Sequence, residues 1–278
     1  MLPNFLIVGA EKAGTTTLWA TLDEHPDVSM CARKEPRFFT DQNWHRGLAW
    51  YESLFSEADN CTAIGEASTA YTWAPESNEA PARIRDCLGD IKYLYCVRHP
   101  IERMISHYRH AVLYRWIPAA TSFEDAIRIK PALYNCSRYY YQIEQYLPYT
   151  EPEQWHVVVL EQIVERPNEV MGQVFDFLGV HRRAVESLYA QNVTDDKVQP
   201  WLSVDRLRPY GYFLPKPMRR WGKWAVESFG HKKIAKPTID ERVRDDLLTR
   251  LMPDIEAMAR FCGQDLLALW QIDAHTTV

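Results

Sequence analysis

Residues 9–17 place a lysine inside a glycine-bounded turn, a combination that could bind and polarise an anion. The segment reads Gly-Ala-Glu-Lys-Ala-Gly-Thr-Thr-Thr, follows the apolar run 5–8 and precedes a helix-like stretch at 18–24. A turn of this kind between a strand and a helix directs backbone N–H groups and the helix N-terminus at a phosphate-like anion. The pattern therefore predicts an anion site, against the simpler alternative of a glycine turn with a solvated lysine.

A second cation stands at the end of a second apolar run. Arg98-His99-Pro100 follows residues 93–97, and Ser106 comes eight residues after the arginine. Arginine presents a planar fork of donors that suits phosphate, although the same residues could simply end a strand and begin a helix at the proline. Two anion sites at strand ends suggest a ligand that is charged at both ends.

The first segment differs from the phosphate-binding loop of nucleotide triphosphatases, which reads Gly, four residues, Gly, Lys and then Ser or Thr. The two glycines keep that spacing, but Thr15 stands where the lysine is expected and Lys12 lies three positions earlier. In the triphosphatase loop the lysine reaches the β- and γ-phosphates and the following hydroxyl holds magnesium. With Lys12 inside the turn, a 5′-phosphosulfate is favoured over a triphosphate, and no metal ion is expected.

Together the two segments resemble the donor site of the sulfotransferases that use 3′-phosphoadenosine 5′-phosphosulfate (PAPS). The turn at 9–17 is similar to their 5′-phosphosulfate loop, and the arginine with the later serine is similar to their 3′-phosphate site. The resemblance implies that PAPS is the co-substrate. It also implies donor-binding roles for Lys12, Ala13, Gly14, Thr15, Thr16, Thr17, Arg98 and Ser106.

Further motifs resemble one branch of this family, the heparan-sulfate-type and related bacterial enzymes. They include, in chain order, Lys34-Glu35-Pro36 and Gly65-Glu66-Ala67-Ser68 followed by Tyr71. The resemblance implies that Glu66 is the general base and that Lys12 stabilises the leaving phosphate. Without it, Glu66 could equally form a salt bridge or cap a turn, and we expect His99 and His107 to be structural. Acceptor contacts are implied for Lys34, Glu35 and Tyr139.

Strand-like and helix-like segments alternate along the chain, which predicts a parallel sheet with helices on both faces. Because ligands bind outside the carboxyl ends of parallel strands, charges that follow several strands converge on one edge. The resemblance covers nearly the whole chain and implies a single α/β domain of the P-loop type over residues 1–278. The expected strands are 5–8, 62–64, 91–97 and 155–160, and the expected helices are 16–24, 81–88, 100–113, 123–129, 139–147, 167–178, 240–251 and 254–269.

Residues 198–237 interrupt this pattern, since five prolines prevent any long helix there. We expect an irregular excursion from the domain. Basic residues outnumber acidic ones within 206–236, so the excursion could contact the 3′-phosphate or an anionic acceptor, or it could be a solvated loop.

The composition is that of a globular protein, with 46% hydrophobic and 25% charged residues among 278. The net charge of −5 gives no reason to expect nucleic acid as a partner, and no run approaches the ~18 to 20 apolar residues of a membrane span. The six cysteines lack metal-ligand spacing. We expect a cytoplasmic, bacterial-type enzyme without a metal, whose oligomeric state the sequence does not indicate.

Two other functions stay open at this point. An ATP-dependent P-loop kinase or other phosphotransferase would use the loop for a different donor, and a non-catalytic nucleotide- or glycan-binding protein would retain the loop without the chemistry. The acceptor is open as well: it could be a hydroxyl or an amine of a carbohydrate, a glycolipid, another lipid or a small metabolite.

Overall fold

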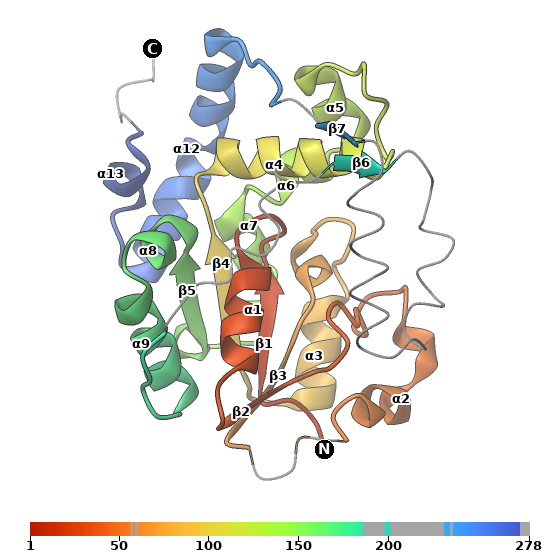
Figure 1. Ribbon diagram of the computed structural model, residues 1–278, viewed down its shortest axis with the longest axis vertical. Coiled ribbons are helices and arrows are strands. Elements are labelled where there is room, and N and C mark those ends of the chain that lie inside the picture. The colour runs from red at the N-terminus through yellow and green to blue at the C-terminus, as the bar shows by residue number, and fades with distance from the viewer. Residues whose placement is uncertain (57, 59–60, 186–197, 201–230, 234–235, 273–278) are drawn as a thin grey trace.

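A five-stranded sheet forms the centre of the computed structural model, which describes residues 1–56, 58, 61–185, 198–200, 231–233 and 236–272 (Figure 1). All neighbouring strands are parallel, in the order β2-β3-β1-β4-β5. The predicted α/β fold is thus confirmed. The strands are β1 (Phe5–Gly9), β2 (Val28–Met30), β3 (Ala63–Ala67), β4 (Lys92–Val97) and β5 (Trp155–Val159).

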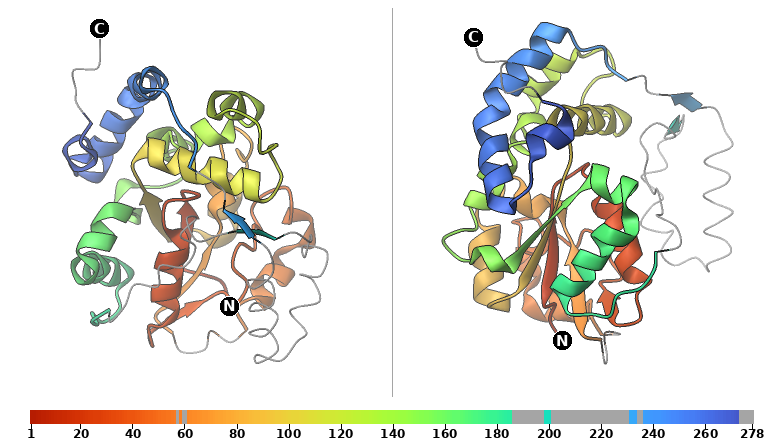
Figure 2. Two further views of the ribbon diagram at one scale, coloured as in Figure 1. Left: turned by 45° about the horizontal axis from the view of Figure 1, so that its top comes forward. Right: turned by 90° about the vertical axis from the view of Figure 1, so that its left-hand side faces the viewer.

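Helices cover both faces of the sheet, as expected for parallel strands. The described helices are α1 (Thr15–Asp23), α2 (Leu48–Ser53), α3 (Ala80–Leu88), α4 (Pro100–Leu113), α5 (Phe123–Ile129), α6 (Ala132–Asn135), α7 (Tyr139–Glu144), α8 (Leu160–Glu165), α9 (Pro167–Leu178), α12 (Glu241–Cys262) and α13 (Leu266–Trp270), with short 3-10 turns η1 (Trp44–Arg46), η2 (Thr69–Thr72) and η3 (Pro152–Gln154). In Figures 1 and 2, α1, α8 and α9 lie on one face, and α3 and α7 lie on the other. Helix α4 runs across the carboxyl ends of the strands.

The contact between β1 and β3 fixes the register of the strand that carries Glu66. Leu6 lies opposite Glu66, and Phe5 lies opposite Gly65. A Cβ atom on Gly65 would stand 2.2 Å from Cζ of Phe5, far inside van der Waals contact. Only glycine fits beside the phenylalanine ring, so the two strands pack closely. This packing fixes the position of Glu66 opposite Leu6 in the pair of strands.

Some expected element boundaries need correction. The strand β2 was not predicted, because its three residues carry no readable periodicity. Glu66 lies inside β3 and not just after it, since pairing with β1 continues as far as Ala67. Leu160 begins α8 and does not end β5.

A single helix, α12, replaces the two helices that were expected on either side of Pro253. Proline removes one N–H from the helical ladder. The buried positions of α12 nevertheless continue at helical spacing through Leu251 and Ile255, and tertiary packing of this kind overrides a local breaking signal.

One carboxylate joins α12 to α7. The oxygens of Asp254 accept hydrogen bonds from the backbone N–H groups of Tyr140 at 3.1 Å and Tyr141 at 2.8 Å. These N–H groups belong to the first turn of α7, which has no helical carbonyl partner for them. The C-terminal part of the chain therefore supports the helix that begins at Tyr139.

The proline-rich segment contains two short strands, β6 (Val198–Pro200) and β7 (His231–Lys233), which pair antiparallel. Apart from these two strands and residues 236–237, the predicted excursion over 198–237 lies outside the described residues. The basic residues between 206 and 230 lie outside the described residues. Of the predicted basic group, Lys236 donates to Oε2 of Glu102 at 3.0 Å.

Candidate active site

Three neighbouring strands bring the predicted donor and catalytic residues to one edge of the sheet. Strand β1 lies between β3 and β4, so the turn that follows β1 lies between Glu66 of β3 and Arg98 just after β4. Helix α4 crosses this edge in Figure 1. Ligands of parallel sheets bind outside the carboxyl ends of the strands, and this edge is the candidate active site.

The turn between β1 and α1 has an unusual backbone at two residues. Gly14, the N-cap of α1, has a φ of 94°, and a Cβ atom there would stand 2.7 Å from Cδ1 of Leu160. Lys12 has a φ of 70°, a left-handed conformation that few residues with a side chain adopt. The turn thus depends on a glycine at one point and on support from its surroundings at the other.

The backbone donors of this turn are fewer than the sequence suggested. The N–H of Ala13 donates to the carbonyl oxygen of Ala10 at 3.2 Å, and the N–H of Leu18 donates to Gly14 at 3.1 Å. The N–H groups of residues 15–17 precede the first helical bond and have no carbonyl of α1 to pair with. They are the anion-binding donors that the turn offers.

A second ammonium group approaches the turn from the segment after β2. Nζ of Lys34 donates to Oγ1 of Thr16. Burial lowers the pKa of Lys34, and the charge of Glu35 partly opposes this. Lys34 therefore lies on the donor side of the site, whereas the resemblance had implied a contact with the acceptor.

Glu66 is fully buried and accepts three hydrogen bonds from side chains. Oε1 accepts from the hydroxyl groups of Tyr71 at 2.5 Å and Tyr51 at 3.2 Å, and Oε2 accepts from Oγ of Ser68 at 2.9 Å. Burial raises the pKa of this carboxyl to about 7, although the three hydrogen bonds oppose the shift. A carboxyl with such a pKa exchanges its proton near neutral pH, as a general base must.

Glu35 holds the segment that follows β3. Its carboxylate accepts from the backbone N–H of Thr69 at 3.0 Å and from Oγ1 of Thr69 at 3.2 Å. Its backbone N–H donates to the carbonyl of Ala67 at 2.9 Å. Burial raises the pKa of Glu35, and the guanidinium of Arg37 opposes this. The residue thus positions the polypeptide beside Glu66.

Arg98 lies half-buried at the end of β4, and Tyr139 fixes its backbone. The tyrosine hydroxyl donates to the carbonyl of Arg98 at 2.6 Å and accepts from its N–H at 3.3 Å. Among the described residues, the guanidinium of Arg98 forms no hydrogen bond or ion pair. Ser106 follows on α4 and is 8% exposed. The arginine is therefore fixed at its main chain while its donors stay available to an anion.

Residues 2–203 match the family model of the sulfotransferase domain. The chain belongs to the sulfotransferase family. The resemblance drawn from the motifs is thereby confirmed.

Curated relatives show the same assignment. The heparan sulfate glucosamine 3-O-sulfotransferase 3B1 of Mus musculus is 34% identical over 202 residues, which make up 69% of this chain and 50% of that protein. The bifunctional heparan sulfate N-deacetylase/N-sulfotransferase 3 of Homo sapiens is 32% identical over 199 residues, or 64% of this chain and 22% of that protein. This sulfotransferase-family chain thus spans about half the length of the first relative and less of the second.

A solved structure matches over nearly the whole length. The sulfotransferase from Alicyclobacillus acidocaldarius superimposes with a TM-score of 0.69 and 23% identity, covering 98% of this chain and 99% of that one. At this level of identity the likeness supports the fold.

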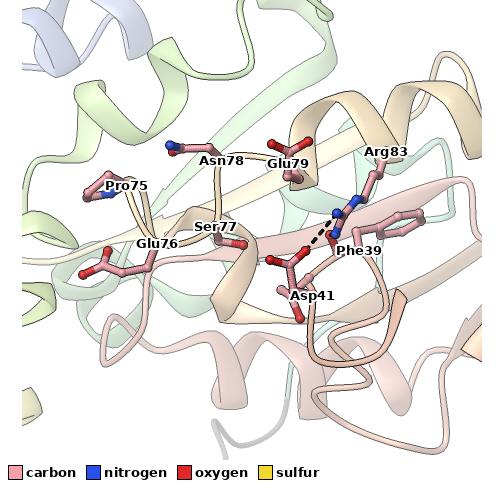
Figure 3. Close-up of a pocket in the computed structure, with 9 residues that line it drawn as sticks. Phe39, Asp41, Pro75, Glu76, Ser77, Asn78, Glu79 and Arg83 are labelled. Atoms are coloured by element: carbon pink, nitrogen blue, oxygen red, sulfur yellow. Dashed lines mark hydrogen bonds and ion pairs between the residues drawn. The ribbon is translucent and has the colours of Figure 1, made fainter. Parts of the chain in front are cut away.

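The sulfotransferase domain has a cavity of about 210 Å³ next to the residues that surround Glu66 (Figure 3). Its wall includes Phe39, whose ring centroid lies 5.5 Å from that of Tyr71. Arg83 forms an ion pair with Asp41 across the cavity, with 2.8 Å between Nη2 and Oδ1. The remaining lining residues are Thr40, Pro75, Glu76, Ser77, Asn78 and Glu79.

The two histidines of the donor side have structural contacts. Nδ1 of His99 accepts from the N–H of Ile101 at 3.2 Å and caps α4, and burial lowers the pKa of His99 to about 4. His107 is fully buried and lies 3.3 Å from Glu11. These contacts account for both histidines, and we assign neither of them the role of general base.

Within the described part of the chain, no group of three or more His, Cys, Asp or Glu side chains is arranged to hold a metal ion. No helix there combines the length and apolar character needed to cross a membrane.

Two residues that were expected beside the acceptor, Lys34 and Tyr139, contact the donor side in the structure, and one contact of Glu66 was not predicted. Tyr139 is fully buried and hydrogen-bonds to the main chain of Arg98, so we do not propose an acceptor contact for it. Tyr51 was not predicted to contact Glu66, because it lies 15 residues away on α2 and no spacing rule connects the two. Ser68 and Tyr71 belong to the same motif as Glu66, which was the available signal for them.

Proposed function

We propose that this protein transfers a sulfuryl group from PAPS to a hydroxyl or an amine of a carbohydrate, a lipid or a small-molecule acceptor. The observation that most supports this is the convergence of Lys12, Glu66 and Arg98 on one sheet edge from three neighbouring strands. The transfer requires one cation for each end of the donor and a carboxylate with a raised pKa, which here lies on the neighbouring strand β3.

In the proposed reaction the bond between sulfur and the bridging oxygen of the donor breaks, and a bond forms between sulfur and the acceptor atom. The bridging oxygen keeps the bonding electrons, so negative charge develops on the 5′-phosphate. The ammonium of Lys12 and the N–H groups of residues 15–17 are the groups we assign to that charge. A preorganised donor of this kind contributes roughly 3 to 4 kcal/mol to the stabilisation of a transition state.

We assign the 3′-phosphate of the donor to Arg98 and Ser106. A guanidinium binds phosphate through two parallel hydrogen bonds, and its neighbour Tyr139 keeps the arginine backbone fixed. The adenosine of the donor would then lie across the edge between β1 and β4.

We assign the acceptor proton to Oε2 of Glu66. A carboxylate oxygen accepts about two hydrogen bonds, and Oε1 already has two, from Tyr51 and Tyr71. Oε2 has one, from Ser68. Since Glu66 is fully buried, an acceptor must displace a covering side chain to contact this oxygen.

The acceptor class is proposed from the cavity beside Phe39. Its lining includes the carboxylates of Asp41, Glu76 and Glu79 and one guanidinium, that of Arg83. Unpaired negative charge disfavours a polyanionic ligand, so we propose a neutral or cationic acceptor. A screen that compares unsulfated with sulfated oligosaccharides, together with amines and lipid alcohols, would test this. Preference for the sulfated chains would contradict it.

The six cysteines are all free thiols, which supports a reducing compartment. We therefore keep the cytoplasm as the proposed location. A bacterial source, the single domain over residues 1–278 and a contact of the basic segment 206–236 with the donor stay predictions. The oligomeric state is left open.

A ligand-binding experiment tests the donor assignment. Thermal unfolding would be followed with adenosine 3′,5′-bisphosphate (PAP), the product left by the donor, and separately with ATP and magnesium. We expect a higher Tm with PAP and a smaller change with ATP. Stabilisation by ATP and magnesium alone would favour a kinase. PAP binding without turnover of PAPS on any acceptor would favour a non-catalytic binding protein.

A further inference from the structure

The residue before Lys12 is held from three directions by α4. The carbonyl oxygen of Glu11 accepts from Nη1 of Arg103 at 3.0 Å. Its carboxylate lies 3.3 Å from Nε2 of His107 and 3.4 Å from Nδ1 of His110. Both Arg103 and His107 are fully buried, and Glu11 is 8% exposed. Main chain and side chain of Glu11 are thus both anchored to one helix.

The hydrogen-bonding partners of His107 fix the position of its proton. A guanidinium can only donate, and Nη1 of Arg103 lies 3.2 Å from Nδ1 of His107, so Nδ1 must accept. Burial lowers the pKa of His107 to about 3, which leaves the ring neutral with its hydrogen on Nε2. The nitrogen that carries this hydrogen lies 3.3 Å from Oε2 of Glu11, without the geometry of a hydrogen bond.

The charge of Glu11 is compensated inside the protein. Burial alone would raise its pKa, but the neighbouring His110 and Arg103 hold the pKa of Glu11 below its usual range. Of these, the guanidinium of Arg103 is permanently charged. The same guanidinium donates to the main-chain carbonyl of Glu11. Loss of this contact would leave a buried charge without one of its partners, so the contact keeps the turn against α4.

Arg103 is itself fixed by the rest of the structure. Its Nε donates to Oγ of Ser137 at 2.5 Å, and its Nη2 donates to the carbonyl of Leu133. Oγ of Ser137 in turn donates to the carbonyl of Pro100 at 3.1 Å. The guanidinium is therefore held in one orientation between α4 and the segment around α6, and it can act as a rigid support for the turn.

The support is needed because Lys12 has a left-handed backbone, with a φ of 70°. Such a conformation is unfavourable for a residue with a side chain, and it persists only where the surroundings impose it. The carbonyl held by Arg103 belongs to the peptide unit that joins Glu11 to Lys12, so its orientation and the φ of Lys12 are coupled directly.

We propose that Arg103 and Glu11 are positioning residues for the transfer: they impose the backbone conformation of Lys12 and so direct its ammonium at the leaving phosphate. This rests on the proposed function. The proposal gives α4 a role at both ends of the donor. The helix supports the turn that carries Lys12, and it also begins beside Arg98 and carries Ser106. Neither Arg103 nor Glu11 contacts the reacting atoms in this assignment.

A double-mutant cycle tests the proposal. The variants are Glu11→Ala, Lys12→Ala and both together, with kcat and KM measured for PAPS. We expect Glu11→Ala to lower kcat roughly 10- to 100-fold through misplacement of the lysine. In the Lys12→Ala background it should have almost no further effect, because it acts through that lysine. An equal decrease of kcat in both backgrounds would overturn the proposal.

Rescue by a conservative variant separates positioning from general stability. Glu11→Gln keeps the shape of the side chain and an oxygen beside His107, and it is expected to retain kcat within a few-fold of the original. The matched control is Asp27→Ala, which removes another carboxylate next to a histidine, 3.1 Å from Nδ1 of His181, away from the turn. It should leave kcat unchanged. A kcat of Glu11→Gln as low as that of Glu11→Ala would contradict the role of this contact.

A measurement that does not depend on turnover distinguishes failure of this proposal from failure of the proposed function. Amide hydrogen exchange of a peptide covering residues 9–17 should be faster in Glu11→Ala and in Arg103→Lys, which keeps the charge but loses the fork of donors. It should be unchanged in Asp27→Ala. Unchanged amide exchange of residues 9–17 in Glu11→Ala would contradict the positioning role even if the protein transfers sulfuryl groups. Faster exchange in a protein that turns over no PAPS would uphold the anchoring and reject the function.

Discussion

The hydroxyl group of Tyr139 holds the main chain of Arg98, to which it donates one hydrogen bond at 2.6 Å and from which it accepts another at 3.3 Å. Both partners are backbone atoms, so the tyrosine orients the arginine without occupying its guanidinium. Tyr139, which the sequence placed beside the acceptor, thereby supports the arginine that we propose for the 3′-phosphate.

Replacement of Tyr139 by phenylalanine should weaken donor binding. The variant loses two hydrogen bonds and leaves a carbonyl of Arg98 without its partner, at a cost of about 1 to 2 kcal/mol. We expect the Kd for PAP, measured by titration calorimetry, to rise roughly 3- to 10-fold. The control is Tyr146→Phe, which removes a buried hydrogen bond to the carbonyl of Tyr71 at 2.8 Å. It should lower stability without changing the affinity for PAP.

Replacement of Arg98 by alanine should remove the recognition of the 3′-phosphate. Hydrogen bonds to a charged group contribute about 1.5 to 3 kcal/mol, so the Kd for PAP should rise roughly 10- to 100-fold. Adenosine 5′-monophosphate lacks the 3′-phosphate, and its Kd should not change. Arg85→Ala, which removes an exposed arginine from α3, serves as the control. An equal loss for both nucleotides would place Arg98 elsewhere than at the 3′-phosphate.

Turnover should depend on a single ionisation near neutral pH. The pKa of Glu66 is raised to about 7, and only the ionised form can take the acceptor proton. We expect kcat to rise with pH up to a plateau above about pH 7. Glu66→Gln should abolish turnover and still bind PAP. Full turnover of Glu66→Gln would show that another group is the base.

The raised pKa of Glu66 also makes the free energy of unfolding depend on pH. Between an unfolded pKa of 4.5 and a folded pKa of about 7, the folded state binds more protons at Glu66 than the unfolded state, so stability falls as the pH rises. The stabilisation is complete below pH 4.5 and lost above pH 7. Relative to Glu66→Gln, the free energy of unfolding should decrease by about 3 kcal/mol across this interval, measured by urea denaturation at several pH values.

Gly14 should tolerate no side chain, for two separable reasons. Its φ of 94° strains any other residue, and a Cβ atom would collide with Leu160. We expect Gly14→Ala to lose about 2 kcal/mol or more of stability. Leu160→Ala removes the collision but not the backbone strain. In the Leu160→Ala background, Gly14→Ala should therefore cost less stability than in the original protein, but it should still be destabilising. Denaturation of all four proteins measures the two contributions.

The sequence predicted best those elements whose ends carry strong local signals. Helix α4 begins at Pro100 and α9 at Pro167, and both have the predicted bounds, because proline suits the first helical turn and not its interior. The same rule failed at Pro253, which lies inside α12. There the packing of the apolar face decides the outcome, and packing partners far along the chain are not visible in a local pattern.

The residues around Glu66 and Glu11 also divide into those that local sequence signals can predict and those that depend on tertiary packing. The motif that contains Glu66 also contains Ser68 and Tyr71, so these neighbours were within reach of sequence reasoning. Tyr51 comes from α2, and the arrangement of Arg103 around Glu11 depends on where α4 crosses the sheet. Contacts of this kind follow from tertiary geometry, which single residues and their spacing do not encode.

The hydrogen bonds of Asp254 to α7 extend the scaffold of the proposed donor site beyond the segment that matches the family model. That segment ends at residue 203 and includes Lys12, Arg98 and Ser106, which we propose as PAPS ligands. Asp254 caps the first turn of α7, α7 presents Tyr139, and Tyr139 supports Arg98. A protein shortened at the limit of the family match would keep all its ligand-binding side chains and lose the scaffold of one of them. The structural unit that holds Arg98 in place is therefore larger than the segment that matches the family model.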